Sequence, residues 1–104
     1  MPAQYDDDLK MECAAWVAEQ LAEEGVLIDP PLVFMLLNME EHVRESNGEF
    51  LAHAEASRLV AELAAAEGVR AEPAPISPEL VLGILSWEDE FLSFAGIPRQ
   101  AGKI

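Results

Sequence analysis

Cysteine, histidine and lysine are scarce in this chain, and the shortage of cysteine excludes the most common structural sites. The single cysteine, Cys13, permits neither a disulfide within the chain nor a cysteine-based zinc site, and a small buried apolar role is expected for it. Residues 6–8 are aspartates, where a signal peptide would carry basic residues followed by an apolar run. We therefore expect a soluble protein of the reducing cytoplasm.

Long apolar runs, alternating strands and catalytic motifs are also missing. No apolar segment approaches the ~20 residues of a membrane-spanning helix, and no segment alternates as a half-buried strand does. The glycines predicted to end helices stand singly, so no phosphate-cradling loop is expected. The serines lie neither near a histidine nor in a strained turn, which leaves nucleophilic catalysis without a candidate and favours a protein that is not an enzyme.

Positive charge is the next shortage. Six lysines and arginines face 20 aspartates and glutamates, for a formal net charge of -14. Nucleic acids and anionic membranes need neutralising cations, so neither is expected as a partner. The acidic excess suits metal cations or a basic protein partner, and a salt-adapted host would select it equally well.

What the chain does contain is apolar residues at helical spacing. Hydrophobic residues make up 51% of the chain, which predicts one folded domain over residues 1–104. Their spacing predicts helices over about 9–24, 30–45, 49–67 and 78–93. Ser46 and Glu49 have capping-box spacing ahead of the third helix. Four aromatic residues stand at positions expected to face the core: Trp16, Phe34, Trp87 and Phe91.

Two of these helices begin in the same way, with a capping residue, a proline and an apolar run. The segment from Ile28 to Leu37 matches the segment from Ile76 to Leu85, and residues 17–26 match residues 60–69 at seven of ten positions. The repetition predicts an all-α, four-helix arrangement of two tandem helix–loop–helix hairpins related by a pseudo-two-fold axis. The alternative is chance similarity between two amphipathic hairpins. The predicted parts are hairpin 1 over about 9–45, hairpin 2 over about 49–93 and a tail over 97–104.

The repeat aligns two pairs of acids on the second and fourth helices, which makes them candidate metal ligands. Carboxylates that face each other across a helical bundle, joined by a histidine, can hold a divalent metal. The familiar glutamate and histidine spacing of three is missing, however, so the ordinary interpretation is that these acids are solvated flanks. The candidate ligands are Glu40, Glu41, Glu88, Asp89 and His42.

The second helix is apolar on most sides over its first two turns, which favours contact with another copy of the chain. We expect Phe34, Met35 and Leu82 to contribute to such an interface and the protein to be a homodimer. The function these features favour is a non-enzymatic protein-interaction or assembly module without a cofactor, with a basic protein as its possible partner. The alternative function is a carboxylate-rich, metal-binding helical bundle, with or without catalytic activity.

Overall fold

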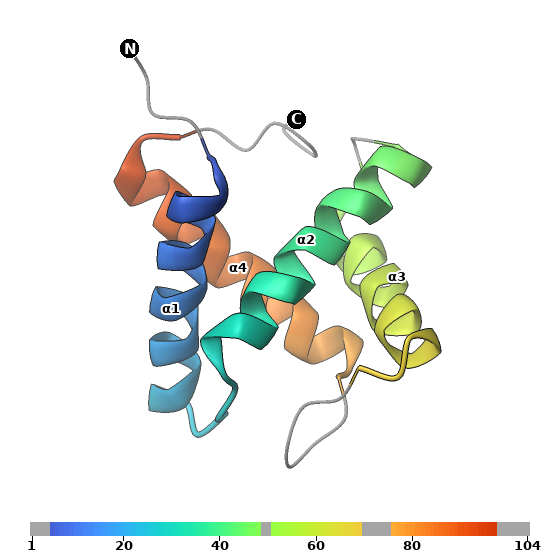
Figure 1. Ribbon diagram of the computed structural model, residues 1–104, viewed down its shortest axis with the longest axis horizontal. Helices are drawn as coiled ribbons and strands as arrows, with labels where there is room; N and C mark the ends of the chain where they lie inside the picture. The colour runs from blue at the N-terminus through green and yellow to red at the C-terminus, as the bar shows by residue number, and fades with distance from the viewer. Residues whose placement is uncertain (1–4, 49–50, 70–75, 98–104) are drawn as a thin grey trace.

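The structure is a computed structural model, and it describes residues 5–48, 51–69 and 76–97. These residues form four helices and no strand, which confirms the predicted all-α, four-helix class (Figure 1). No helix among them is long and apolar enough to cross a membrane. The helices are α1 Asp7–Glu23, α2 Pro30–Asn47, α3 His53–Ala66 and α4 Pro78–Ala95.

The helix starts follow the local signals closely, with one difference between the two proline-led helices. Asp6 caps α1 by accepting a hydrogen bond from the Leu9 backbone N–H, 2.9 Å away. Ser77 caps α4 in the same way, through the Leu80 N–H at 3.1 Å. Asp29 has the extended backbone of a cap residue before α2, but its side chain makes no capping hydrogen bond.

The boundaries around α3 and after α4 differ from the prediction. Helix α2 continues through Ser46 to Asn47, and α3 begins only at His53, while Glu49 lies outside the described residues. The residue before α3 is Ala52, which has no side-chain group to cap it. Ile97 is buried after the left-handed Gly96 rather than part of a loose tail, and residues 98–104 lie outside the described ranges.

Helices α2 and α4 cross at the centre of the molecule, and α1 and α3 lie on opposite flanks (Figure 1). Helix α1 packs mainly on α2 and also on α4, whereas α3 packs mainly on α4 and also on α2. Within the described ranges α1 and α3 share no contact. Each flanking helix therefore covers one side of the central crossing.

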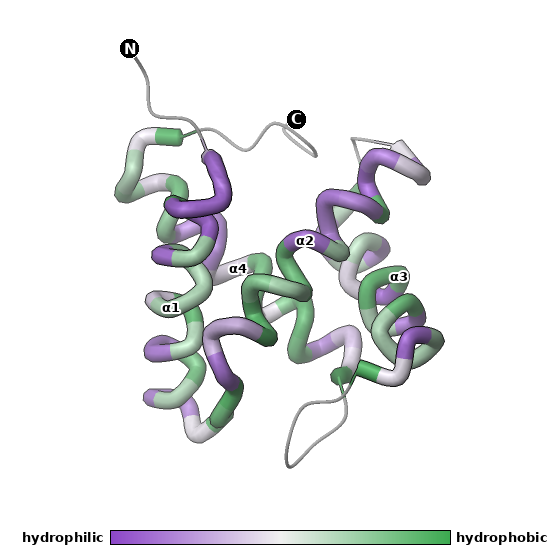
Figure 2. Tube along the Cα trace, in the orientation of Figure 1, coloured by the Kyte–Doolittle hydropathy of each residue, from purple (hydrophilic) through white to green (hydrophobic). Residues whose placement is uncertain are grey.

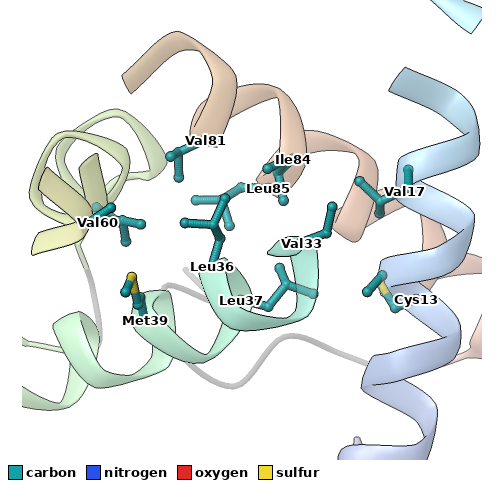
Figure 3. Close-up of a cluster of buried hydrophobic side chains, with 14 of the residues drawn as sticks. Cys13, Val17, Val33, Leu36, Leu37, Met39, Val60, Val81, Ile84 and Leu85 are labelled. Carbon is teal, nitrogen blue, oxygen red and sulfur yellow. The ribbon is translucent and has the colours of Figure 1, made fainter. Parts of the chain in front are cut away.

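The core is built where these helices meet. Val33, Leu36 and Leu37 of α2 are at most 1% exposed. Val33 and Leu36 lie near the fully buried Ile84 and Leu85 of α4, and Leu37 lies on the side of Cys13 of α1 (Figure 3). Burying an aliphatic side chain of this size contributes about 1.5–3 kcal/mol, so the core that these residues form with α1 and α3 supplies a large part of the stability. Helix α2 is apolar where it crosses α4 and becomes polar toward its C-terminal turns (Figure 2).

Candidate functional site

The predicted metal ligands on α2 and α4 are divided between the interior and the surface. Glu40 is 2% exposed and Glu88 is 1% exposed, so the interpretation of these two residues as solvated flanks was wrong. Glu41 and Asp89, one position further along each helix, are exposed. His42 is also exposed. The helical stripe that carries Glu40 and Glu88 thus continues the core face rather than leaving it.

Glu40 lies beside a buried arginine one turn along α2. Arg44 is 1% exposed, and its Nε donates a hydrogen bond to the Glu40 carboxylate. A second nitrogen of the guanidinium donates to the backbone carbonyl of Leu51, 2.6 Å away, just ahead of α3. Arg44 therefore satisfies a buried carboxylate and at the same time holds the chain that leads into α3.

The third contact of Arg44 determines the tautomer of His53. A guanidinium nitrogen of Arg44 lies 2.9 Å from His53 Nδ1, and His53 Nε2 lies 2.7 Å from an Asp89 carboxylate oxygen. A guanidinium can only donate, so Nδ1 accepts and the proton of the neutral ring is on Nε2, which donates to Asp89. This chain of contacts joins α2, α3 and α4.

A matching contact joins α1 to α2. Lys10 is 3% exposed, and its Nζ donates to the Asn38 side-chain oxygen at 2.9 Å and pairs with Glu41 at 2.7 Å. The same ammonium lies 5.6 Å from the centre of the Tyr5 ring. Lys10 is therefore a structural cation that links helices.

Glu88 is reached by the segment that precedes α1. The Tyr5 hydroxyl donates a hydrogen bond of 2.5 Å to a Glu88 carboxylate oxygen. Burial of the phenol and the negative charge of Glu88 both hold the pKa of Tyr5 far above its usual range, because each disfavours a phenolate there. Tyr5 thus remains a hydrogen-bond donor throughout the physiological range.

These contacts separate the candidate ligands rather than gathering them. Glu40 meets Arg44, Glu41 meets Lys10, and Asp89 meets His53. In the described part of the chain, no group of three or more histidine, cysteine, aspartate or glutamate side chains is arranged to hold a metal ion. The metal site stays a prediction, which would be tested by metal content after dialysis, with Glu40→Ala and Glu88→Ala as variants.

A second candidate site lies along the flank where α1 meets α4. The Trp16 ring centre lies 5.6 Å from that of Trp87, 6.0 Å from that of Phe91 and 5.6 Å from that of Phe94. Phe94 is 71% exposed, and the other three are only partly buried, so the predicted core residues here instead border the core. We call these four residues the aromatic face.

Sequence reasoning missed most of the residues that matter here, although some signals were present. Lys10 precedes Cys13, Val17 and Leu21 at helical spacing, and Arg44 follows Glu40 by one turn on the core stripe. A charge on an apolar stripe indicates a buried, paired side chain. Phe94, seven positions after Trp87, could likewise have been placed on the stripe of Trp87 and Phe91.

Comparison of the chain with protein-family models, curated proteins and solved structures finds no match in any of the three. The functional proposals below therefore depend on the chain's own residues.

Proposed function

We propose that this protein is a non-enzymatic interaction module that binds a basic protein partner. The observation that carries the proposal is that the lysine and arginine side chains of the described ranges are already paired with groups of this chain. Lys10 and Arg44 are buried and paired, and Arg58 lies between Glu55 and Glu62 on α3. Most acidic side chains on the accessible surface of these ranges therefore have no lysine or arginine beside them.

The charge of Arg58 interacts with two carboxylates of its own helix. Its hydrogen bond to Glu55 lowers the pKa of that carboxyl group, and hydrogen bonds to Glu55 and Glu62 raise the pKa of the guanidinium. Binding a basic surface would replace solvated counterions around the remaining acids, and association would be fast and salt-dependent.

The test is capture on immobilised protein from an extract of the host, followed by reconstitution with the purified partner. We expect a basic protein that binds stoichiometrically at ~0.1 M salt and is released near ~1 M salt, where the Debye length falls from ~10 Å to ~3 Å. A variant in which the exposed Glu12, Glu19 and Glu90 are replaced by glutamine should bind more weakly. A reconstituted complex that is insensitive to salt would contradict the proposal.

We also propose homodimerisation, because two of the predicted interface residues are accessible. Met35 is 43% exposed and Leu82 is 37% exposed, while Phe34 is partly buried against the core. Light scattering should give the mass of two chains at micromolar concentration, and Met35→Glu should reduce it to one. The mass of one chain for the unmodified protein would contradict the dimer.

An internal duplication would explain the arrangement of buried residues. The buried positions of α3 stand 43 residues after buried positions of α1, and those of α4 stand 48 residues after buried positions of α2. At the same offsets, the pair Lys10–Glu41 corresponds to the pair His53–Asp89. We propose that the two hairpins arose as copies related by a pseudo-two-fold axis through the crossing of α2 and α4.

The duplication has a structural test. If the two hairpins pack equivalently, Val17→Ala in α1 and Val60→Ala in α3, which stand 43 residues apart and are both fully buried, should lower the free energy of unfolding by similar amounts. A clearly larger loss for one of the two variants would contradict equivalence.

A further inference from the structure

We infer that the aromatic face of α1 and α4 binds an amphipathic basic helix of the partner protein. This inference depends on the proposed function for the class of partner, and it adds the place and the form of binding. Trp16, Trp87, Phe91 and Phe94 supply the apolar contact, and the acids beside them supply the charge.

The shape of the apolar part suits a helix. Trp87, Phe91 and Phe94 follow one another at i, i+4 and i+7, which places them along one side of α4 over ~10 Å. Trp16 reaches this row from α1 and contacts all three rings. A row of this length accepts two or three apolar anchors from a helix laid along it, and large aromatic side chains dominate such interfaces.

The charges beside the row select a basic occupant. Glu12 and Glu19 stand one turn before and one turn after Trp16 on α1, and both are exposed. Glu90 stands on α4 between Trp87 and Phe94 and is exposed too. Helix α4 contains no lysine or arginine, and α1 contains only the buried Lys10. Lysines or arginines flanking the apolar anchors of a partner helix would therefore meet glutamates, and they could also stack on the indole rings.

The same charges disfavour a second copy of this chain at the aromatic face. Self-association there would place Glu12, Glu19 and Glu90 of one copy close to the same residues of the other. Like charges brought together at an interface repel each other, so a copy of this chain is a poorer occupant than a basic segment. Homodimerisation through Met35 and Leu82 would use other residues and leave the aromatic face accessible.

The experiment uses three synthetic peptides of equal length on the full chain. The first is an amphipathic helix with leucines on one face and lysines on the other. The second has the same composition in an order that spreads the leucines around the helix, and the third replaces the lysines of the first with glutamates. Trp16 and Trp87 are the only tryptophans of the chain, so their fluorescence reports directly on this face.

We expect the first peptide to shift the tryptophan emission and to bind at least tenfold more tightly than the second, with no binding of the third. Phe94→Ala should weaken binding of the first peptide about tenfold. Phe94 is exposed, so unfolding of this variant is not expected, and its circular dichroism and thermal midpoint would verify that. The matched control is Met11→Ala, which removes an apolar side chain that is 52% exposed outside the aromatic face, and it should leave binding unchanged.

The alternative outcomes distinguish the two proposals. Equal affinity for the first two peptides would overturn the proposal that the aromatic face binds a helix, and so would equal affinity of the unmodified chain and Phe94→Ala for the first peptide. Neither result would contradict the proposal of a basic partner. Absence of binding by both cationic peptides at low salt would count against the basic partner as well. Binding of the acidic peptide, or a Phe94-dependent dimer seen by sedimentation, would overturn the choice of a basic occupant.

Discussion

Among the charged residues, Arg44 is expected to have a large effect on stability, because it is buried and makes three contacts. Arg44→Met removes the buried hydrogen bond to Glu40 and the partly buried contacts with the Leu51 carbonyl and His53. Removing one partner of a buried ion pair costs about 3–5 kcal/mol, because the other charge stays in a poorly solvated site. The measurement is the urea midpoint of unfolding.

Arg58→Met is the matched control for Arg44→Met. Arg58 contacts two carboxylates where Arg44 contacts one, but its side chain is 49% exposed, so water replaces what the variant loses. A midpoint shift for Arg44→Met no larger than that for Arg58→Met would refute the structural role of the buried arginine.

The partly buried contact between Tyr5 and Glu88 predicts that the protein loses stability at alkaline pH. Burial and the charge of Glu88 raise the pKa of Tyr5 in the folded protein, whereas an unfolded tyrosine ionises near pH 10. Above about pH 10 the folded state binds one more proton at this site than the unfolded state. The free energy of unfolding should therefore fall by about 1.4 kcal/mol for each further pH unit, whereas it is unaffected by this group below pH 10.

Tyr5 is the only tyrosine of the chain, so phenolate absorbance follows it without interference. We expect the phenolate to appear together with the loss of helical circular dichroism, and Tyr5→Phe to show a shallower decline of stability with pH. Ionisation near pH 10 with the helices intact would show that the contact with Glu88 is absent in solution.

Ser57 is a buried polar side chain on α3. It is 1% exposed, and its hydroxyl oxygen finds no hydrogen-bond partner among the described residues. Ser57→Ala should raise the free energy of unfolding by about 1 kcal/mol, since it removes a buried polar group without a partner. Ser86→Ala, at an exposed position of α4, measures the gain in helix propensity alone. An equal gain for both variants would indicate that Ser57 is satisfied in solution.

At the scale of helices, the two proline-led starts are expected to differ. Ser77→Ala should cost about 1 kcal/mol, because Ser77 satisfies the Leu80 N–H. Asp29→Ala should cost about 0.5 kcal/mol, because the Asp29 side chain makes no capping bond and contributes only its charge near the helix N-terminus. Thermal unfolding of both variants measures the difference, and a larger cost for Asp29→Ala would contradict these cap geometries.

At the scale of the whole molecule, the charge of -14 should make stability depend on salt. Raising salt from ~0.01 M to ~1 M shortens the Debye length from ~30 Å to ~3 Å and screens repulsion among the acids. We expect the thermal midpoint to rise by ~4–8 °C for each 1 kcal/mol of repulsion relieved. Replacing the exposed Glu12, Glu19 and Glu23 with glutamine should reduce the increase. A midpoint that falls with salt would mean that attractive ion pairs dominate.

The sequence by itself determined the features that depend on neighbouring residues along the chain. The start of α2 at Pro30, the start of α4 at Pro78 and the end of α4 at Gly96 follow from capping residues, proline and glycine, which act within one helical turn. The all-α class follows for the same reason, because helical spacing of apolar residues is a local pattern.

Only the tertiary structure decided which partners the buried charged side chains meet and which apolar side chains remain exposed. Glu40 and Glu41 are adjacent acids, yet one lies inside with Arg44 and the other outside with Lys10. Trp87 and Phe94 stand on a core-like stripe, yet Trp87 is only partly buried and Phe94 is 71% exposed beside Trp16 of α1. The physical reason is that burial depends on what faces a residue across the structure, and the crossing of α2 and α4 with a helix on each flank is not encoded in any short segment.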